Sequence, residues 1–349
     1  MKPMTLMAIT AMSLGSLACK KTDTTAKNVK SQEVAMSDTD RGIAQINEGI
    51  RQKVIAEQQT DPEGLARRDA HPKAHGCVKA EFKVNATLSP DLQTRLLQPG
   101  ATYPAWIRFS NSTGMNPDQA PDGRGMALKV MNVPGETILT PESGTHDFIM
   151  INAPVFFIAG ITDYLENMMA SAMGTLDQFF AKYPSSLEAV TRIRSAKVFN
   201  PLHAQYFSMV PYKLNQHAIK FSAKPCTDST TKASQDPQDP NFLRQAMVDS
   251  LKTESSCFDF MIQKQGNPDT MPIEDPRVEW DQKASPFQKV ATLTVLKQEF
   301  DTPENATFCR DIAFNPWNAL PEHEPLGTIN LIRKVVYQSI STLRHELNQ

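Results

Sequence analysis

The sequence has no excess of charge of either sign and few of the features that mark several common protein classes. Its 36 Lys and Arg are matched by 38 Asp and Glu, and the formal net charge of −2 gives no electrostatic reason to expect nucleic acid. No internal repeat is visible, and glycine is scarcer than proline, at 15 against 25 residues. Prolines spread along the chain favour long, stiff connections over a helical bundle. The 349 residues can bury a large core, as one big domain or two ordinary ones.

The N-terminal apolar run, residues 5–17, is too short to span a bilayer as a stable helix, but it is typical of a secretory signal. Small residues then lead to Cys19, as at a bacterial lipoprotein processing site, although Ser16 stands where a leucine is usual. Cleavage by the ordinary signal peptidase is the alternative. We expect a signal peptide over 1–19 with lipid on Cys19, a flexible linker over 20–38, and an exported, periplasmic lipoprotein of a bacterium that touches the membrane only through its anchor.

Cysteine is rare, and the absence of a C-x-x-C spacing argues against a structural zinc site and a thioredoxin-like motif. After Cys19 there remain Cys77, Cys226, Cys257 and Cys309, and an even number in an exported chain permits disulfides. The sequence does not give the pairing, although Cys226 and Cys257 flank the polar segment TDSTTKASQDPQDPN and would close it. Four buried thiols are the alternative.

Hydrophobic periodicity predicts both strands and helices. Apolar and polar residues alternate in GCVKAEFKVNATL, and less regularly in AWIRFSNS, GMALKVMN, AIKFSAKP and VATLTVLKQEF. Helical spacing is present over residues 40–59, 162–181, 185–195 and 241–254 and at the C-terminus. Strands grouped early, with inserted helices and a terminal helix, predict an α+β domain built on an antiparallel sheet or barrel.

The C-terminal stretch NLIRKVVYQSISTLRHELNQ places Tyr337 between two arginines. Arg333 precedes it by four residues and Arg344 follows it by seven, so a helix would bring all three side chains to one face. An adjacent cation favours the ionised phenol, and a phenolate is a ligand for ferric iron. From these residues alone, an amphipathic helix with a half-buried tyrosine and two solvated arginines is the alternative.

Polar residues also gather around the first two predicted strands. His71 and His75 are four apart and could share a metal on a helix, but Pro72 and the following strand pattern argue against a helix there, and so against a zinc hydrolase. Arg108 and Ser110 alternate along WIRFSNS and point to one face, where buried polar groups need partners. In DFIMINAPVFFIAG an Asn-Ala-Pro step interrupts an apolar run, a place where the backbone could open toward a pocket.

Seven short pieces of the sequence, in order from Arg68 to Arg344, together resemble the haem catalase family in its short, catalase-related branch. They are RDAHPK, WIRFSNS, DGRGMALKV, NAPVFFI, QYFSMVPYKLN, AFNPWN and RKVVYQSISTLR. Each piece is weak alone, and the resemblance rests on their order and spacing. It implies that residues 39–349 form a catalase-like haem domain, an eight-stranded antiparallel β-barrel with surrounding helices. It also implies that the C-terminal helical domain of full-length catalases is lacking, so no nicotinamide cofactor is expected.

The resemblance also implies roles for individual residues around a b-type haem. Tyr337 is similar to the proximal iron ligand, and Arg333 to the neighbour that keeps it ionised. His71 is similar to the distal base, and Ser110 to the serine that holds its ring. Three arginines are similar to those that neutralise the haem propionates: Arg68, Arg108 and Arg344. Tyr164 takes the place of a phenylalanine near the haem.

Two further departures from the family pattern bear on the reaction. Aligned on NAPVFFI, Ile151 replaces the distal asparagine, while Asn152 matches the second of two consecutive asparagines. Ile151 cannot orient a second peroxide by hydrogen bonding, so weak true catalase activity is expected. Ala70, before His71, is smaller than the usual valine and could admit bulkier reductants.

We therefore expect a haem-dependent peroxidase that reduces hydrogen peroxide or organic hydroperoxides with an unidentified small-molecule reductant, possible assembly into homo-oligomers, and no nucleic-acid partner. Two alternatives stay open, a non-enzymatic haem-binding or haem-storage lipoprotein and a fatty-acid hydroperoxide isomerase or lyase. His75 is an alternative distal base, although only His71 has Arg68 at the matching offset. The remaining histidines are expected at the surface or in loops: His146, His203, His217, His323 and His345.

Overall fold

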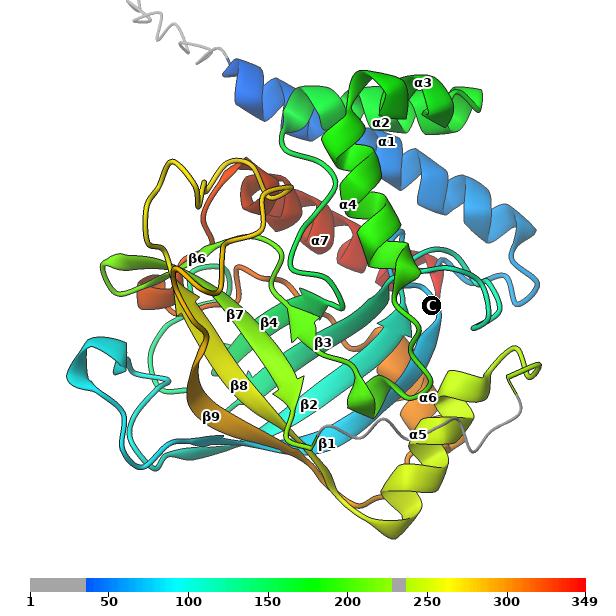
Figure 1. Cartoon of the computed structure of the whole chain (residues 1–349). Coiled ribbons are helices and arrows are strands. Elements are labelled where there is room, and N and C mark those ends of the chain that lie inside the picture. The colour runs from blue at the N-terminus through cyan, green and yellow to red at the C-terminus, as the bar shows by residue number, and fades with distance from the viewer. Residues whose placement is uncertain (1–35, 228–236) are drawn as a thin grey trace, which may run out of the picture. The chain divides into compact units, whose positions relative to one another are not determined.

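Nine antiparallel strands lie at the centre of the structure, a computed structural model that describes residues 36–227 and 237–349. They are β1 (Ala74–Val84), β2 (Thr102–Asn111), β3 (Arg124–Met131), β4 (Thr145–Ile151), β5 (Tyr206–Phe207), β6 (Tyr212–Leu214), β7 (His217–Pro225), β8 (Ser256–Lys264) and β9 (Gln288–Val295). The strand order is β5-β4-β3-β2-β1-β9-β8-β7-β6, and β5 also pairs with β7. That pairing closes eight strands into a barrel and leaves β6 outside the ring, on β7 (Figure 1). The predicted eight-stranded antiparallel barrel is confirmed.

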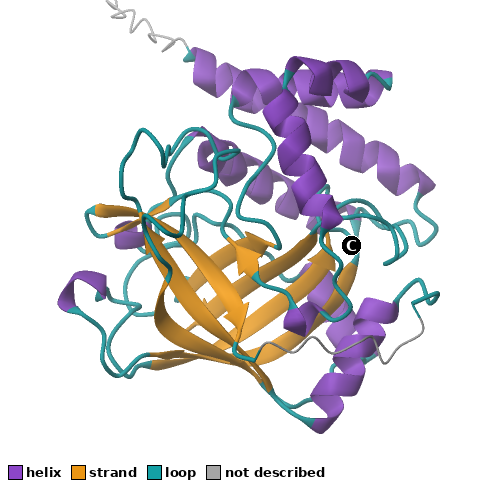
Figure 2. Cartoon of the chain, in the orientation of Figure 1, coloured by secondary structure: helices purple, strands orange, loops and turns teal. Residues whose placement is uncertain are grey.

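Helices surround the barrel, as predicted. The α-helices are α1 (Asp38–Thr60), α2 (Ile161–Met173), α3 (Leu176–Lys182), α4 (Pro184–Ser195), α5 (Phe242–Thr253), α6 (Pro303–Asp311) and α7 (Thr328–Leu347). Short 3-10 helices are η1 (Pro90–Leu92), η2 (Pro201–His203) and η3 (Pro321–His323). Figure 2 shows α1 to α4 gathered on one side of the strands and α5 and α6 elsewhere, and α7 lies between the barrel and α1 in Figure 1. α7 packs against both α1 and α2.

The stretch over residues 162–181 is helical, as predicted, but it is divided into two helices, α2 and α3. Gly174 ends α2 with a left-handed backbone, at φ 68°, and its N–H bonds back to the carbonyls of Ala170 and Ser171. Glycine adopts this conformation without the steric cost that a Cβ imposes, and it is the usual residue at a helix C-terminus. The chain then turns and resumes as α3.

Alternation in the sequence corresponds to the pleat of the strands. In β1, Val78, Ala80, Phe82 and Val84 are buried, while Lys79 and Lys83 are exposed. Strand β8 was missed, although Phe258, Phe260 and Ile262 alternate with Cys257, Asp259 and Met261 in the same way. The two-residue strand β5 and the short β6 are below the length that a period of two can reveal.

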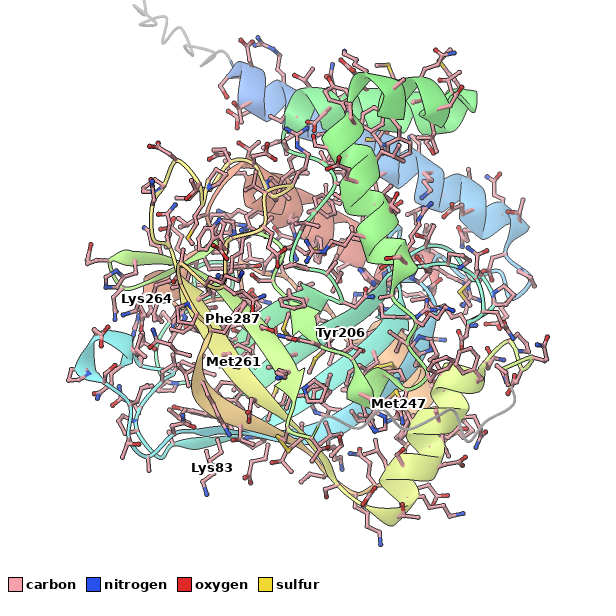
Figure 3. The ribbon with its side chains drawn as sticks, viewed as in Figure 1. Lys83, Tyr206, Met247, Met261, Lys264 and Phe287 are labelled. Atoms are coloured by element: carbon pink, nitrogen blue, oxygen red, sulfur yellow. A yellow bond between two sulfur atoms is a disulfide. The ribbon has the colours of Figure 1, made fainter. Side chains whose placement is uncertain are left out.

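Aromatic rings fill the barrel. Phe148 stands 4.8 Å from Phe260 and 5.0 Å from Phe221, measured between ring centroids, and Phe82 lies 5.2 Å from Phe260. Tyr206, labelled in Figure 3, is fully buried in the same core. Because side chains occupy the interior of a small barrel, a site for a large cofactor has to lie on its outer face.

All four cysteines after Cys19 are paired. Cys77 in β1 is bonded to Cys309 in α6, and Cys226 is bonded to Cys257 in β8, which is the closure that the flanked polar segment suggested. The alternative of four buried thiols is therefore wrong. The first disulfide fixes α6 against the strand that follows His71.

The proposed signal peptide over 1–19, with Cys19, lies outside the described residues, as does most of the linker over 20–38. Asp38, the last residue of that linker, is the first residue of α1, whose N-cap Ser37 accepts a hydrogen bond from the backbone N–H of Asp40. No helix in the described part of the chain is both long and apolar enough to cross a bilayer.

Candidate active site

One row of residues crosses the outer face of the barrel where three strands begin or end. Ser110 of β2 lies opposite Gly125 of β3, and Gly125 lies opposite Ile151 of β4. Cross-strand partners point to the same side of a sheet. Phe109, the strand neighbour of Ser110, packs against Tyr206 and Phe258 across the barrel, so Ser110 and its partners in the row face outward.

His71 lies on this row, in the loop before β1. Its ring Nδ1 is 3.1 Å from Ser110 Oγ and 3.1 Å from the carbonyl oxygen of Asn111. A carbonyl can only accept, so Nδ1 carries the proton and Nε2 is left as a base. The backbone of His71 has φ 62°, a left-handed conformation that non-glycine residues seldom adopt, and its N–H donates to Ser112 O at 2.9 Å. These bonds hold the ring in place.

Gly125 is required by the closeness of the His71 ring. A Cβ added at this position would lie 2.4 Å from Nδ1 and 2.6 Å from Cε1 of His71, and 2.7 Å from Ser110 Oγ. Such separations do not occur between unbonded atoms. Any side chain on residue 125 would therefore push the imidazole off the row.

A buried polar cluster fixes the end of β2 below His71. Asn111 Nδ2 donates to Asp118 Oδ1 at 2.9 Å, and its Oδ1 accepts from Arg124 Nη1 at 2.8 Å. Lys73 forms a salt bridge of 2.8 Å with Asp118. The side chain of Asn111 is thus held on one side of the strand while its carbonyl faces His71.

His75 belongs to this cluster and does not lie on the row. Its Nε2 is 2.9 Å from Asn111 Oδ1, and the residue is 1% exposed. Of the two candidates for a distal base, only His71 is placed beside Ser110.

Two other histidines are buried, contrary to the prediction from sequence. His146 and His323 were expected at the surface or in loops, but they are 2% and 4% exposed, with ring centroids 5.0 Å apart. His146 points inward from β4, next to Phe148, and His323 ends η3. His203 is half-buried, whereas His217 and His345 are exposed, as predicted.

The environment of His71 keeps its imidazole neutral. Burial lowers the pKa of His71 to about 4, and the positive charge of Arg108 acts in the same direction. Arg333 and Arg68 contribute more weakly, while the hydrogen bond to Asn111 opposes the change. Because Arg333 is on α7, its influence also places the C-terminal helix at the same region of the molecule as His71.

On α7, Arg333 contacts two phenols. Its Nη1 donates to Tyr212 OH at 3.1 Å and to Asn330 Oδ1 at 3.0 Å, and its Nη2 lies 3.5 Å from Tyr337 OH. Burial opposes the charge of Arg333, but Tyr212 and Tyr337 outweigh it, so the guanidinium pKa is raised above its ordinary value. Tyr337 is half-buried, and the structure brings it together with Arg333 as the sequence spacing predicts.

Arg68, Arg108 and Arg344 lie together, although they come from different segments. Arg108 and Arg344 are 4% and 3% exposed. Within the described residues none of the three has a carboxylate within 4.0 Å, and Arg108 Nε has no hydrogen-bond partner. Burial lowers the pKa of all three guanidinium groups, for Arg108 to about 9, and mutual repulsion adds to the effect on Arg68 and Arg108. The cluster is short of negative charge.

The C-terminal end of α6 collects part of this cluster. Arg344 Nη1 donates to Arg310 O at 3.0 Å, Arg68 donates to Ile312 O, and the His345 ring contacts Asp311 O at 2.8 Å. The last carbonyls of a helix have no partner within it and carry partial negative charge. Backbone oxygens therefore receive the guanidinium groups of Arg68 and Arg344 in place of carboxylates.

The other predicted residues lie nearby with different degrees of exposure. Tyr164 of α2 is half-buried, and burial raises the pKa of its phenol, as do the neighbouring Asp69 and Tyr337. Ala70 is exposed, next to His71. Asn152 Oδ1 accepts from Arg124 N at 2.7 Å, and its Nδ2 is buried with no protein partner.

Sequence reasoning missed Gly125, Asn111, Tyr212 and Asn330. Gly125 lies in DGRGMALKV, where two glycines separated by one residue at the start of a strand indicate a close approach. Asn330 is three residues before Arg333, a spacing that shares a helical face. Tyr212 is far away in sequence, and only the fold brings it to Arg333.

Comparison with solved structures identifies the fold. A bacterial catalase superimposes with a TM-score of 0.66 at 18% identity, over 92% of this chain and 64% of that one. A fungal catalase gives 0.64 at 15% identity, over 83% of this chain and 61% of that one, and catalase A from Saccharomyces cerevisiae gives 0.64 at 18%, over 84% and 64%. The barrel and its helices therefore have the fold of a catalase.

The family itself follows from sequence. The Catalase family model matches residues 22–325, and the chain belongs to the catalase family, whose members are oxidoreductases that act on peroxide and generally bind haem. A catalase-related peroxidase of Mycolicibacterium paratuberculosis is 25% identical over 260 residues, 70% of this chain and 79% of that protein. Catalase T of Saccharomyces cerevisiae is 23% identical over 320 residues, 82% of this chain but 54% of its own length. The chain thus spans about half of the yeast enzyme.

Proposed function

We propose that this protein is a haem-dependent peroxidase that reduces hydrogen peroxide or organic hydroperoxides with a small-molecule reductant and releases little oxygen. The observation that carries the proposal is the placement of a neutral, oriented imidazole, that of His71, in the same region as the Arg333–Tyr337 pair. Membership of the catalase family and the similarity to a catalase-related peroxidase support the peroxide chemistry.

The residues present fit a haem. Two propionates would supply the negative charge that Arg68, Arg108 and Arg344 lack, and Arg108 Nε is a buried donor without a partner. Arginine suits this task because its planar fork binds carboxylates with two parallel hydrogen bonds. Tyr337 would hold the iron, and Tyr164 would stand beside the ring. When bound, haem supplies the redox-active iron at which the O–O bond is split.

His71 supplies the proton transfer. With its proton fixed on Nδ1 by the carbonyl of Asn111, Nε2 takes a proton from the hydroperoxide and returns it to the departing oxygen. The same atom acts first as a base and then as an acid, so the site needs no second titrating group for this step. Ser110 and Gly125 keep the ring at a fixed position for both transfers.

Arg333 places a fixed positive charge beside Tyr337. A buried guanidinium with a raised pKa keeps its charge at any physiological pH, and its Nη2 lies 3.5 Å from the hydroxyl of Tyr337. The ring of Tyr337 also lies under this cation, with 5.2 Å between the guanidinium carbon and the ring centroid.

Ile151 is the reason to expect little oxygen release. It stands next to Gly125 in the row that carries His71, so an aliphatic side chain occupies the place beside the base. Oxidation of a second peroxide to oxygen needs that molecule held in a definite orientation. An isoleucine offers no hydrogen bond for the purpose, whereas external reductants need no such orientation.

Two substitutions test the proposal. Tyr337→Phe is expected to lose or greatly weaken haem binding, and Tyr103→Phe, which removes a phenol elsewhere, is not. His71→Ala is expected to keep haem and to slow the reaction with a hydroperoxide by about two to four orders of magnitude. The measurements are haem content, the absorption spectrum and its stopped-flow change with hydroperoxide.

The controls separate the alternatives. His217→Ala, at an exposed histidine, should react at the wild-type rate. Stoichiometric haem with an unchanged spectrum in Tyr337→Phe would contradict the ligand assignment. Haem binding without any reaction with hydroperoxide would indicate a storage protein, and turnover of fatty-acid hydroperoxides without a reductant would indicate an isomerase or lyase.

We also propose that the protein is exported and anchored through lipid on Cys19. Pairing of all four later cysteines in disulfides supports an oxidising compartment. Metabolic labelling with a fatty acid should mark the wild-type protein and not a Cys19→Ser variant. An unlabelled wild-type protein in the membrane-free fraction would end the lipoprotein proposal.

A further inference from the structure

Tyr212 is a buried phenol for which the proposed reaction has no use. It lies in β6, 3% exposed, and its hydroxyl oxygen accepts the bond of 3.1 Å from Arg333 Nη1. Through the same guanidinium it is joined to Tyr337, whose hydroxyl is 3.5 Å from Nη2. Since a guanidinium only donates, the proton of the Tyr212 hydroxyl is not used in this contact.

A small cavity lies beside Tyr212 at one end of the barrel. Its volume is about 10 Å³, measured as the space open to the centre of a water-sized sphere, which is room for a water molecule. Apart from Tyr212, polar groups reach its lining through His146 and His323, and the remaining wall is apolar, including Phe148 and Phe221. Tyr212 is thus one of the residues that line a space with room for a water molecule.

The two histidines can take up a proton. His146 Nδ1 accepts from Leu320 N at 3.3 Å, and His323 Nε2 is 2.8 Å from Thr94 Oγ1. Burial lowers the pKa of His323 to about 4 and that of His146 well below its ordinary value, so both imidazoles are neutral near pH 7. A phenol that loses an electron becomes a very strong acid, and even weakly basic groups then accept its proton.

We propose that Tyr212 is a redox-active residue that gives one electron to the haem site through the Arg333–Tyr337 contact and one proton to the water and histidines of the cavity. The proposal rests on the proposed function, because a hydroperoxide acting at that site is the oxidant. It assigns to Tyr212 the role of an internal donor when the external reductant is scarce.

The step balances. Reduction of one hydroperoxide to an alcohol and water takes two electrons and two protons. Tyr212 supplies one of these electrons, and its proton passes to the cavity, which leaves a neutral phenoxyl radical. A donor of the phenol class then gives one electron to this radical, the cavity returns the proton to the Tyr212 oxygen, and the oxidised donor releases its own proton to solvent. Two such rounds, with two donor molecules, supply the two electrons, and solvent supplies the two protons.

Tyr206 shows what distinguishes Tyr212. It is equally buried, but its hydroxyl donates at 2.8 Å to the carbonyl of Pro201, which is not a base that can take the proton away. It also has no contact with Arg333. Tyr206→Phe is therefore a matched control for Tyr212→Phe, since each removes one buried phenol oxygen.

The experiment uses the haem-loaded protein, mixed with a hydroperoxide without reductant and frozen for electron paramagnetic resonance. The spectrum of a tyrosyl radical is expected, and its lines should become narrower when the protein is made with ring-deuterated tyrosine. The signal should be lost in Tyr212→Phe and kept in Tyr206→Phe. In the wild-type protein a nitroso radical trap, located by peptide mass spectrometry, should mark Tyr212, which gives a result even if the variant fails to bind haem.

The optical spectrum recorded in the same samples separates the two ideas. No spectral change with hydroperoxide means that the proposed function has failed. Three outcomes, each with a spectral change, would overturn the role of Tyr212 and leave the peroxidase proposal standing. They are a tyrosyl signal that persists in Tyr212→Phe, the absence of any tyrosyl signal, and a radical trap found on Tyr164 or Tyr337 alone.

Discussion

Two features of its surroundings let His71 act as a base. The carbonyl of Asn111 fixes the proton on Nδ1, and burial with nearby arginines lowers the pKa to about 4. A histidine with its ordinary pKa would be protonated, and useless as a base, below about pH 6.5. In this site the base stays available through that range.

The pH dependence of the reaction follows. The rate constant for the first reaction with a hydroperoxide should stay level as the pH falls from 7 to about 5 and decline only near pH 4, where Nε2 becomes protonated. Stopped-flow absorbance across this range, with circular dichroism as a check that the protein stays folded, measures it. A decline centred near pH 6.5 would contradict the assignment of the base.

Ile151 allows a gain-of-function prediction. Replacing it by asparagine puts an amide in the row beside Gly125, where it can hold a second peroxide. Oxygen release should then rise relative to donor oxidation, while the first reaction with hydroperoxide changes little. An oxygen electrode and a dye-oxidation assay give the two rates, with Ile151→Val as the control. Wild-type oxygen release equal to that of Catalase T would refute this account of Ile151.

Strand β3 contributes Gly125 to the site, and the lack of a side chain at this position leaves room for the His71 ring. Gly125→Ala should slow the first reaction with hydroperoxide nearly as much as His71→Ala, because the new Cβ would overlap the imidazole at 2.4 Å. Gly266→Ala is the control, since its Cβ would meet only Met271 at 3.5 Å, an ordinary contact. Haem content should be normal in both variants. A Gly125→Ala protein with the wild-type rate would show that His71 is not confined by β3.

Helix α6 marks the limit of what periodicity can reveal. Its nine residues, PENATFCRD, contain Cys309 as their single buried residue, so they carry no apolar stripe. Its position is fixed by the disulfide to Cys77 and by cations at its C-terminal carbonyls, and neither is a local signal. Long elements with clear periods, such as β1 and α7, were predicted close to their observed bounds.

In the candidate site, too, some contacts could be predicted from the sequence and others could not. Residues at a fixed offset on one element, such as Arg333 and Tyr337, could be grouped from the sequence. Contacts between elements could not, and the approach of Gly125 to His71 or of Tyr212 to Arg333 depends on the closure of the barrel. The resemblance to catalases supplied His71, but it contained nothing on the cavity beside Tyr212.

The two disulfides should differ in their effect on stability. Cys77–Cys309 joins residues 232 apart in sequence, and Cys226–Cys257 joins residues 31 apart. Loop-closure entropy in the unfolded chain gives about 5 kcal/mol for the first and about 4 kcal/mol for the second. Cys77→Ser with Cys309→Ser should therefore lower the free energy of unfolding in urea more than the other pair of substitutions. The reverse order would show that the constraint acts in the folded state.

Buried neutral histidines should make the protein sensitive to acid. His71, His75 and His323 have pKa values lowered to about 4, and that of His146 is also lowered, whereas in the unfolded chain these groups titrate near pH 6.5. Between these values the unfolded state binds more protons, so stability falls as the pH drops from about 6.5 to 4. Urea midpoints over this range measure the fall. His323→Gln should reduce it and His217→Gln should not.

The two seams that join the halves of the barrel, β1 with β9 and β5 with β4 and β7, differ greatly in the number of paired residues. β1 and β9 are joined by five residue pairs, whereas β5 bridges β4 and β7 through one pair, Ile151 with Phe207, and two pairs with β7. Ser110 and Gly125 lie in the half that contains β1 to β4. A transient parting of the two halves along β5 would thus leave the strands under His71 joined, and amide protons of β5 should exchange with deuterium well before those of β1 and β2.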